Sequence, residues 1–127
     1  MIDPVWTARL LSVLRIASAL LLLQHGTAKF LGFPEPVNPP QFSPAWIAGL
    51  FELVGGALLV IGLLTRPVAF LLSGMTAVAY FLVHAPMGFY PILNKGELAA
   101  LYSFVFLYIA AAGPGPWSVD ALMRRRA

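Results

Sequence analysis

The sequence predicts an all-α fold, a transmembrane four-helix bundle that runs up-down-up-down, and three observations support it. Of the 127 residues, 60% are hydrophobic and 10% are charged, with a mean hydropathy of +0.85. An average soluble domain carries about a quarter charged residues, so this composition indicates a membrane protein. Four apolar segments approach the ~20 helical residues that cross a ~30 Å hydrocarbon layer. The short connections between them make successive helices antiparallel neighbours.

The first expected helix, at about 6–30, carries a polar stripe. At ~100° per residue, its charged and polar side chains fall within one arc, while several leucines lie outside it. The polar members of that arc are Arg15, Ser18, His25 and Lys29. Because the rest of the chain is also apolar, we expect this stripe to face the interior of a bundle. A proline-rich loop follows and ends the helix.

Three further helices are expected, at about 44–64, 67–85 and 95–112, with a short surface segment at 117–126. Ser43 followed by Pro44 is typical of a helix start. The glycines of that helix would allow close approach to a neighbour within a membrane. Asn94 and Glu97 have the spacing of a capping box, which would open the last long helix.

The basic residues predict the orientation. Arg9, Arg66 and the three C-terminal arginines fall on one side of the bundle, and Lys29 and Lys95 fall on the other. The positive-inside rule then places both termini in the cytoplasm. We expect residues 1–127 to form one domain that crosses the cell inner (plasma) membrane several times, in contact with the lipid bilayer.

This topology gathers polar side chains in the outer half of the bundle, from all four helices. Ionisable groups at membrane depth cost about 2.5–3.5 kcal/mol each on insertion scales, so they are usually paired or functional. The candidate catalytic residues are Glu52, His25 and Lys29, and the candidate cofactor-binding residues are Arg15, His25, Glu52, His84, Asn94, Glu97 and Tyr102. Structural roles remain open for them, since Glu52 also fits a buried ion pair and Glu97 a helix cap.

The residue types narrow the choice of cofactor. The absence of cysteine excludes dithiol relays, iron–sulfur clusters and structural disulfides. His25 and His84 fit a haem, or a metal site with nearby carboxylates, but the chain lacks a closely spaced ligand motif. Haem or metal ligation is therefore the less favoured use of the two histidines. Nucleic-acid binding is not expected, because a basic binding face needs a soluble surface to carry it.

Several short patterns follow one another along nearly the whole chain. They are Arg15, His25-Gly26-x-x-Lys29, Glu52 with Gly55-Gly56, Gly62-x-x-Thr65-Arg66, Asn94-x-Gly96-Glu97 with Tyr102, and Gly113-Pro114-Gly115 before Ser118-x-Asp120. Their order and spacing resemble the DoxX family of small four-helix integral membrane proteins. The resemblance implies a link to a membrane thiosulfate–quinone oxidoreductase and to oxidative-stress and thiol-redox systems. Without cysteine, any redox role here must use a quinone, another cofactor or a partner subunit.

We therefore expect a component of a membrane redox system that binds a quinone-like small molecule in the outer half of the bundle. His25, Glu52 and Lys29 would hold the headgroup and exchange protons, with Arg15 balancing charge from below. The expected apolar walls are Leu22, Leu59 and Phe104. As an enzyme, the chain would be a quinone-linked oxidoreductase subunit that works with a redox partner or as a homo-oligomer. The alternatives are a non-enzymatic scaffold or assembly factor for a redox enzyme, and a transporter of small molecules or lipids.

Overall fold

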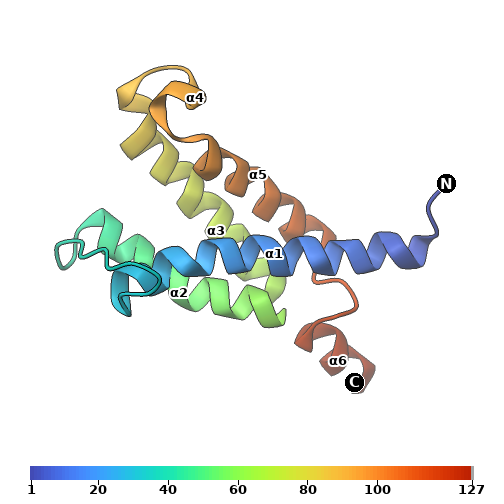
Figure 1. Ribbon diagram of the computed structural model, residues 1–127. Helices are drawn as coiled ribbons and strands as arrows, with labels where there is room; N and C mark the ends of the chain where they lie inside the picture. Colours follow the sequence, from blue (N-terminus) through green and yellow to red (C-terminus); the bar gives the residue numbers. More distant parts are fainter. Residues whose placement is uncertain (127) are drawn as a thin grey trace.

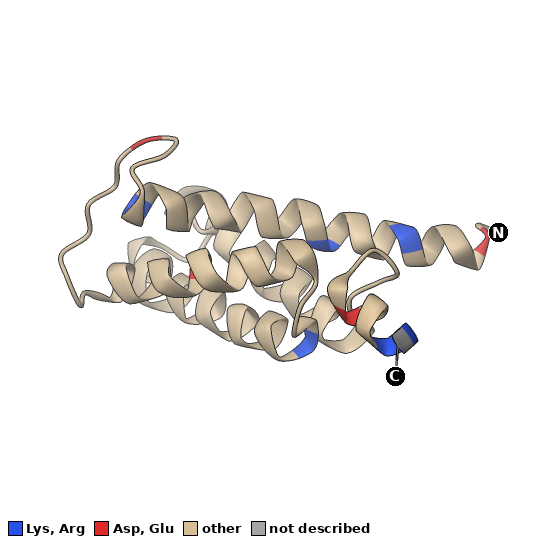
Figure 2. Cartoon of the chain, turned by 90° about the horizontal axis from the view of Figure 1, so that it is seen from below, with Lys and Arg blue, Asp and Glu red and all other residues tan. Residues whose placement is uncertain are grey.

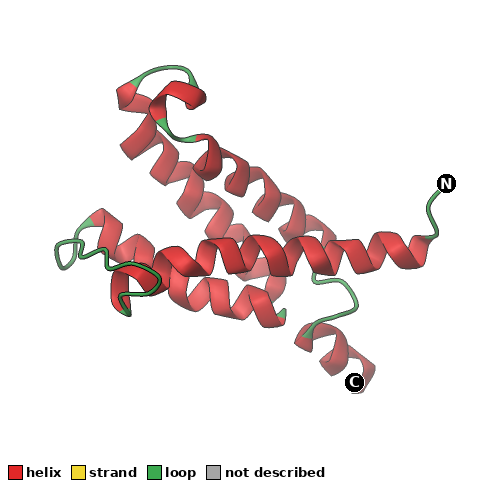
Figure 3. Cartoon of the chain, in the orientation of Figure 1, coloured by secondary structure: helices red, strands yellow, loops and turns green. Residues whose placement is uncertain are grey.

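A computed structural model describes residues 1–126, which are built of helices joined by short connections (Figures 1 and 3). In chain order, the elements are α1 (Pro4–Phe30), α2 (Pro44–Ile61), α3 (Thr65–Ala79), a π-helical turn (Tyr80–His84), a 3₁₀ turn (Ala85–Met87), α4 (Pro91–Asn94), α5 (Glu97–Ala112) and α6 (Val119–Arg126). No strand occurs among the described residues. The all-α prediction is confirmed.

The long helices form two pairs, α1 with α2 and α3 with α5, and α2 also contacts α3. Figure 1 shows the two pairs diverging toward the end that carries α4 and the connection between α1 and α2. We call this end, with residues 31–43 and 85–96, the loop end. The opposite end, with residues 62–64 and 113–126, is the α6 end. The divergence leaves space between the pairs at the loop end.

Helix α1 begins with a side-chain cap and presents its polar stripe to the other helices. Asp3 accepts a hydrogen bond from the Val5 amide at 2.8 Å, and Pro4 occupies the first turn, where its missing N–H costs nothing. Arg15 and Ser18 are both buried, as are Leu22 and Gly26 on the same face. The prediction that this stripe faces inward is confirmed at these positions.

Glycines bring α1 and α2 into backbone contact. A Cβ atom on Gly26 would lie 2.5 Å from the Leu53 nitrogen, and one on Gly56 would lie 3.1 Å from the Leu23 Cα. Side chains larger than hydrogen would therefore push the helices apart. Small residues serve this purpose between membrane helices, where packing rather than hydrophobic burial drives association.

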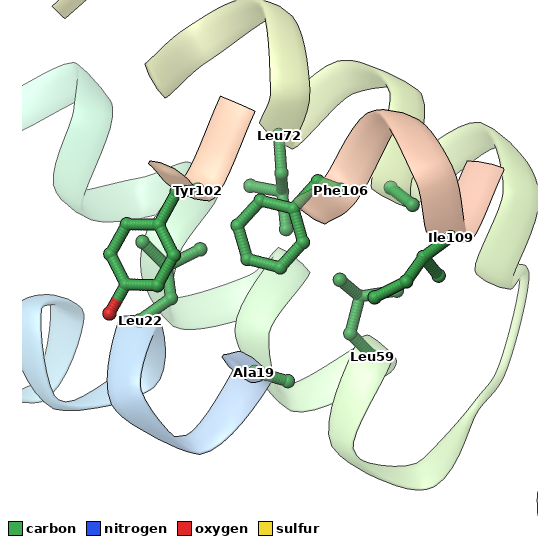
Figure 4. Packing of buried hydrophobic residues seen from close by; sticks show 8 residues of the cluster. Ala19, Leu22, Leu59, Leu72, Tyr102, Phe106 and Ile109 are labelled. Carbon is green, nitrogen blue, oxygen red and sulfur yellow. The ribbon is translucent and has the colours of Figure 1, made fainter. Parts of the chain in front are cut away.

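The packed core lies between all four long helices and toward the α6 end (Figure 4). Leu59 comes from the last turns of α2, Leu72 from the first half of α3, and Phe106 from the second half of α5. The full cluster is Ala19, Leu22, Leu59, Ala69, Leu72, Tyr102, Phe106 and Ile109. This core joins the two helix pairs where they do not diverge.

The outer surface of the bundle is apolar. Phe70, Phe81 and Phe104 are 63%, 68% and 70% exposed, which is unfavourable in water and ordinary in lipid. Three helical segments are long and apolar enough to cross a membrane, and α5 is apolar but shorter at 16 residues. Charged positions lie mostly toward the two ends of the long helices (Figure 2). This distribution fits a band of hydrocarbon around the middle of the bundle.

Several helix boundaries differ from the predicted ones: α1 begins at Pro4 rather than near 6, and α3 spans Thr65–Ala79 rather than about 67–85. Backbone conformation explains the end of α2 and the start of α5. Helix α2 ends at Ile61 rather than near 64, because Gly62 and then Leu64 take left-handed conformations. The predicted capping box of Asn94 and Glu97 is wrong. Gly96 is the N-cap of α5, and Asn94 ends the short helix α4.

The chain widens into a π-helical turn at the loop end of α3. The Ala85 amide donates to the Tyr80 carbonyl five residues back. Pro86 follows immediately and has no N–H with which to continue an α-helix. Such π turns often occur at functional sites, and this one holds His84 against the space between the helix pairs.

Candidate functional site

An open cleft of about 900 Å³ lies between the two helix pairs at the loop end. Helices α1, α2, α3 and α5 all contribute to it, and most of the lining side chains are apolar. Its polar or ionisable side chains are His25, Lys29, Glu52, Thr76, His84, Lys95 and Tyr102. We call this space the loop-end cleft. It contains all three of the candidate catalytic residues.

An ion pair between α1 and α2 lies in the wall of the cleft. The Lys29 Nζ atom is 2.6 Å from Glu52 Oε1, and the two side chains are only 15% and 9% exposed. Side chains on a helix lean toward its N-terminus, so on this antiparallel pair the two groups lean toward each other. The buried ion pair that the sequence allows for Glu52 is therefore formed with Lys29.

The side chain of Tyr102 lines the same cleft, and its hydroxyl group has no hydrogen-bond partner among the described residues. Its Oη atom is buried, and no described residue hydrogen-bonds to it. A buried hydroxyl without a partner typically costs about 1–3 kcal/mol. The ring itself is held firmly, stacked on Phe106 with a centroid distance of 5.4 Å. The cleft therefore offers a fixed hydrogen-bonding group to a bound molecule.

The two histidines reach the cleft from different helix pairs. His25 lies on α1 and is half-buried. His84 Nδ1 lies 3.0 Å from the carbonyl oxygen of Asn94, and because that oxygen only accepts, Nδ1 carries the proton. The Nε2 atom of His84 is then the free acceptor. Among residues 1–126, no three His, Cys, Asp or Glu side chains are grouped closely enough to hold a metal ion.

Arg15 does not belong to this cleft. Its guanidinium group is fully buried toward the α6 end, where it donates to the carbonyl oxygens of Leu59 at 2.8 Å, of Trp117 at 2.6 Å, and of Pro114. The expected role of balancing charge beneath the headgroup is therefore wrong. Its partners are backbone carbonyls that no sequence pattern marks as acceptors.

Asn94 lies behind the cleft rather than in its lining. The side chain is fully buried and donates to the Gly88 carbonyl at 3.0 Å and to Tyr80 Oη at 3.2 Å, while it accepts from the Gly96 amide at 2.8 Å. These bonds fix the turn that carries the carbonyl partner of His84. Asn94 is therefore a positioning residue for that histidine, and the structure gives no direct contact with the cleft.

The remaining predicted residues divide between the cleft and other surfaces. Glu97 is exposed and lies outside the cleft lining. Leu22 lines the cleft as expected, whereas Leu59 is buried in the core and Phe104 points outward. Sequence reasoning missed Lys95, whose left-handed backbone, with φ of 62°, places it beside α5. The sequence could have indicated this role for Lys95, because the predicted topology places it on the same side of the bundle as Lys29.

The site combines groups that accept, donate and transfer protons within apolar walls. Glu52 can accept through the carboxylate, Tyr102 can donate or accept, and each histidine ring carries nitrogens that can donate or accept a hydrogen bond. The apolar outer surface and the spans of 27, 18 and 23 residues make the chain a multi-pass helical membrane protein.

The comparisons identify the family of this membrane protein. Residues 10–85 match the DoxX family, so the chain belongs to the DoxX family. It is 46% identical to an uncharacterized protein of Haemophilus influenzae over 120 residues, which cover 87% of both chains. It is 30% identical to the inner membrane protein YqjF of Escherichia coli, covering 90% of this chain and 92% of that protein.

A third relative has a slightly lower identity. The uncharacterized membrane protein Rv3486 of Mycobacterium tuberculosis is 29% identical, covering 90% of this chain and 81% of that protein. No solved structure matches the chain. The family and these relatives place the protein in the inner membrane, which it crosses several times.

Proposed function

We propose that the protein binds a quinone-like small molecule in the loop-end cleft and serves as a component of a membrane redox system. The observation that carries the proposal is the hydroxyl of Tyr102, which is buried without a partner among the described residues and belongs to a side chain that lines an apolar cleft. A quinone carbonyl would accept a hydrogen bond from it. The cleft volume of about 900 Å³ lies within the range of small-molecule sites.

The ionisable groups have distinct roles in this proposal. Glu52 and His25 exchange protons with the bound headgroup, and Lys29 holds the Glu52 carboxylate in place at 2.6 Å. His84 presents Nε2 from the opposite wall because Asn94 fixes its other nitrogen. Metal or haem ligation remains the less favoured alternative for the two histidines.

Electrons must come from another molecule. Reduction of a quinone to a quinol takes two electrons and two protons. The chain has no cysteine to act as a dithiol donor. A partner oxidoreductase subunit therefore supplies the electrons in this proposal, and the chain supplies the binding site and the protons. If it acts as an enzyme, it does so as a quinone-linked oxidoreductase subunit.

The same proposal includes the arrangement in the membrane. The four long segments run up-down-up-down, both termini lie in the cytoplasm, and the loop end faces outward. The distribution of arginines favours this orientation, since Arg9, Arg66, Arg124 and Arg125 belong to the α6 end or to the α1 terminus beside it. A homo-oligomer or a complex with the redox partner would complete the assembly.

A labelling experiment tests the orientation without background, because the chain contains no cysteine. We would introduce Glu35→Cys in the loop between α1 and α2 or Met123→Cys in α6. In intact cells with a permeabilised outer membrane, a membrane-impermeant maleimide should label position 35 only. Lysis should expose position 123. The opposite pattern would invert the topology.

A binding experiment tests the function. The full chain, purified in mild detergent, is titrated with a short-chain ubiquinone analogue while tryptophan fluorescence is recorded. Tyr102→Phe should weaken binding about fivefold to tenfold, the value of one hydrogen bond. Tyr108→Phe is the matched control, since this tyrosine lies on the same helix and is 57% exposed.

The outcomes separate the proposal from its alternatives. Equal binding by both tyrosine variants, or no saturable quinone binding, would contradict it. Glu52→Gln loses the ion pair with Lys29 and should be less stable than the wild type, but the fraction that folds should bind quinone and fail to support quinone reduction with membrane partners. A folded wild-type chain without quinone, together with loss of assembly in Glu52→Gln, would favour a scaffold or assembly factor. Transport of a labelled solute by reconstituted protein would favour a transporter.

A further inference from the structure

A second cleft, of about 720 Å³, lies at the α6 end of the molecule, remote from the candidate site. The first turns of α1, the last turn of α2, and the segment from Pro116 through α6 form its walls. We call it the α6-end cleft. Its described lining contains two arginines, Arg9 and Arg125, and no carboxylate. The nearest acidic group in sequence, Asp120, is instead bonded to the amides of Leu64 and Thr65.

The length of α1 places this cleft at the level of lipid headgroups. The helix has 27 residues, and its length of about 40 Å exceeds the ~30 Å hydrocarbon layer. Arg9 and Lys29 are 20 residues apart, or about 30 Å along the helix, so they fall near opposite boundaries of that layer.

Two tryptophans independently mark the same boundary. Trp6 and Trp117 both lie at the α6 end and are 52% and 51% exposed, as expected for side chains between hydrocarbon and water. The Arg9 guanidinium lies over the Trp6 ring at 5.0 Å from its centroid, which holds the charge at this level.

The rest of the cleft wall is suited to an acyl chain. Val5, Val60, Ile61 and Leu122 line it alongside the arginines. A free phosphate would use the arginines but leave this apolar surface exposed. A zwitterionic lipid would cover the apolar surface but carry a positive group beside the two arginines. A molecule that carries both a net negative charge and an acyl chain matches the two arginines and the apolar part of the wall.

We propose that the α6-end cleft binds an anionic phospholipid, with its phosphate held between Arg9 and Arg125 and one acyl chain against the apolar wall. Basic pockets between membrane helices commonly take such headgroups. The bound lipid would connect α1 to α6 across the cleft. Without it, α1 contacts α6 at this end through the segment that precedes α6. This binding is independent of the function proposed for the loop-end cleft.

The test uses the full chain, delipidated in mild detergent. Its thermal midpoint is measured with dioleoylphosphatidylglycerol, with dioleoylphosphatidylcholine, which has the same acyl chains, and with inorganic phosphate. Phosphatidylglycerol should raise the midpoint in a saturable manner, and the other two should not. Arg9→Gln and Arg125→Gln should each weaken phosphatidylglycerol binding about fivefold, the contribution of one basic residue near an anionic lipid.

The matched control is Arg124→Gln, which makes the same charge change in the same helix outside the cleft lining. It should bind phosphatidylglycerol like the wild type. Equal stabilisation by both lipids would overturn the proposal, as would equal losses in all three variants. Stabilisation by phosphate alone would show an anion site rather than a lipid site and would also overturn it. If an arginine variant does not fold, lipid retention by the wild type in native mass spectrometry decides between the two lipids.

Discussion

The two ends of the bundle use buried charge in different ways. At the α6 end, Arg15 gives its donors to three backbone carbonyls, and Asp120 accepts from two backbone amides. At the loop end, ionisable side chains meet one another and an open cleft, and Tyr102 keeps an unpartnered hydroxyl among the described residues. Charge that is bonded to backbone stabilises the fold. Charge beside unfilled space is available to a ligand.

The sharpest way to break this comparison is to remove Arg15. Arg15→Met would remove the donor to the carbonyls of Pro114 and Trp117, and it would leave the Leu59 carbonyl with only the Gly62 amide at 3.2 Å. Each buried group left unpaired costs about 1–3 kcal/mol, so we expect the chain not to accumulate as folded protein. The measurement is the yield of monodisperse protein in detergent, with Arg124→Gln, at an exposed position of α6, as the control that should fold normally. Normal yield and stability of Arg15→Met would refute a structural role.

The next largest effect concerns the loop-end ion pair. Lys29→Met leaves Glu52 buried without its counter-ion, and breaking a buried pair in this way costs about 3–5 kcal/mol. The double variant Lys29→Met with Glu52→Gln should be less destabilised than the two single changes added together. The free energies of unfolding of the wild type, the two single variants and the double variant are compared in a denaturing detergent. Additive losses would mean that the two groups do not interact.

A smaller effect on stability is expected from alanine substitutions at two glycines, one in a closely packed position and one beside open space. Gly26→Ala brings a methyl group within 2.5 Å of the Leu53 nitrogen and should cost about 1–3 kcal/mol as α1 and α2 move apart. Gly74→Ala is the control, because a Cβ there meets nothing within 4 Å, and it should be neutral or stabilising by up to about 1 kcal/mol. Thermal midpoints of the two variants should therefore move in different directions.

The smallest effect is a pH dependence at the α6 end. Burial alone would raise the pKa of Asp120, but hydrogen bonds from the backbone amides of Thr65 and Leu64, with the charge of Arg124, hold that pKa below its usual range. The carboxylate therefore stabilises the docking of α6 fully above its unfolded-state pKa. That stabilisation is lost as the pH falls through the lowered native value.

Fluorescence of Trp117 can follow this loss. In a background of Trp6→Phe and Trp46→Phe, the emission should shift as α6 separates on acidification. The same background with Asp120→Asn should lack that transition. An identical acid transition in the Asn variant would assign it to another group.

The parts of the fold that could be predicted are those encoded by local periodicity. The polar stripe, which repeats every three to four residues, allowed the buried face of α1 to be predicted, and both Arg15 and Gly26 lie on that face. Composition was enough for the membrane class. The helix start at Ser43 is also local, and its hydroxyl accepts from the Trp46 amide at 3.2 Å.

The parts that could not be predicted depend on contacts between distant segments. The partners of Arg15 include backbone carbonyls about 100 residues away in sequence, which have no side-chain signature. Asn94 has capping-box spacing, but the left-handed turn at Lys95 directs it to Tyr80 and Gly88 instead. The lone hydroxyl of Tyr102 is visible only once its surroundings are known.

The uneven placement of the core has a mechanical consequence. Since the packed cluster joins the helix pairs mainly toward the α6 end, we expect the bundle to be stiffer there than where the pairs diverge. Changes in bilayer thickness act on membrane helices at a modest cost per ångström of mismatch. We therefore expect the thickness of the surrounding bilayer to influence the separation of the helix pairs at the loop end.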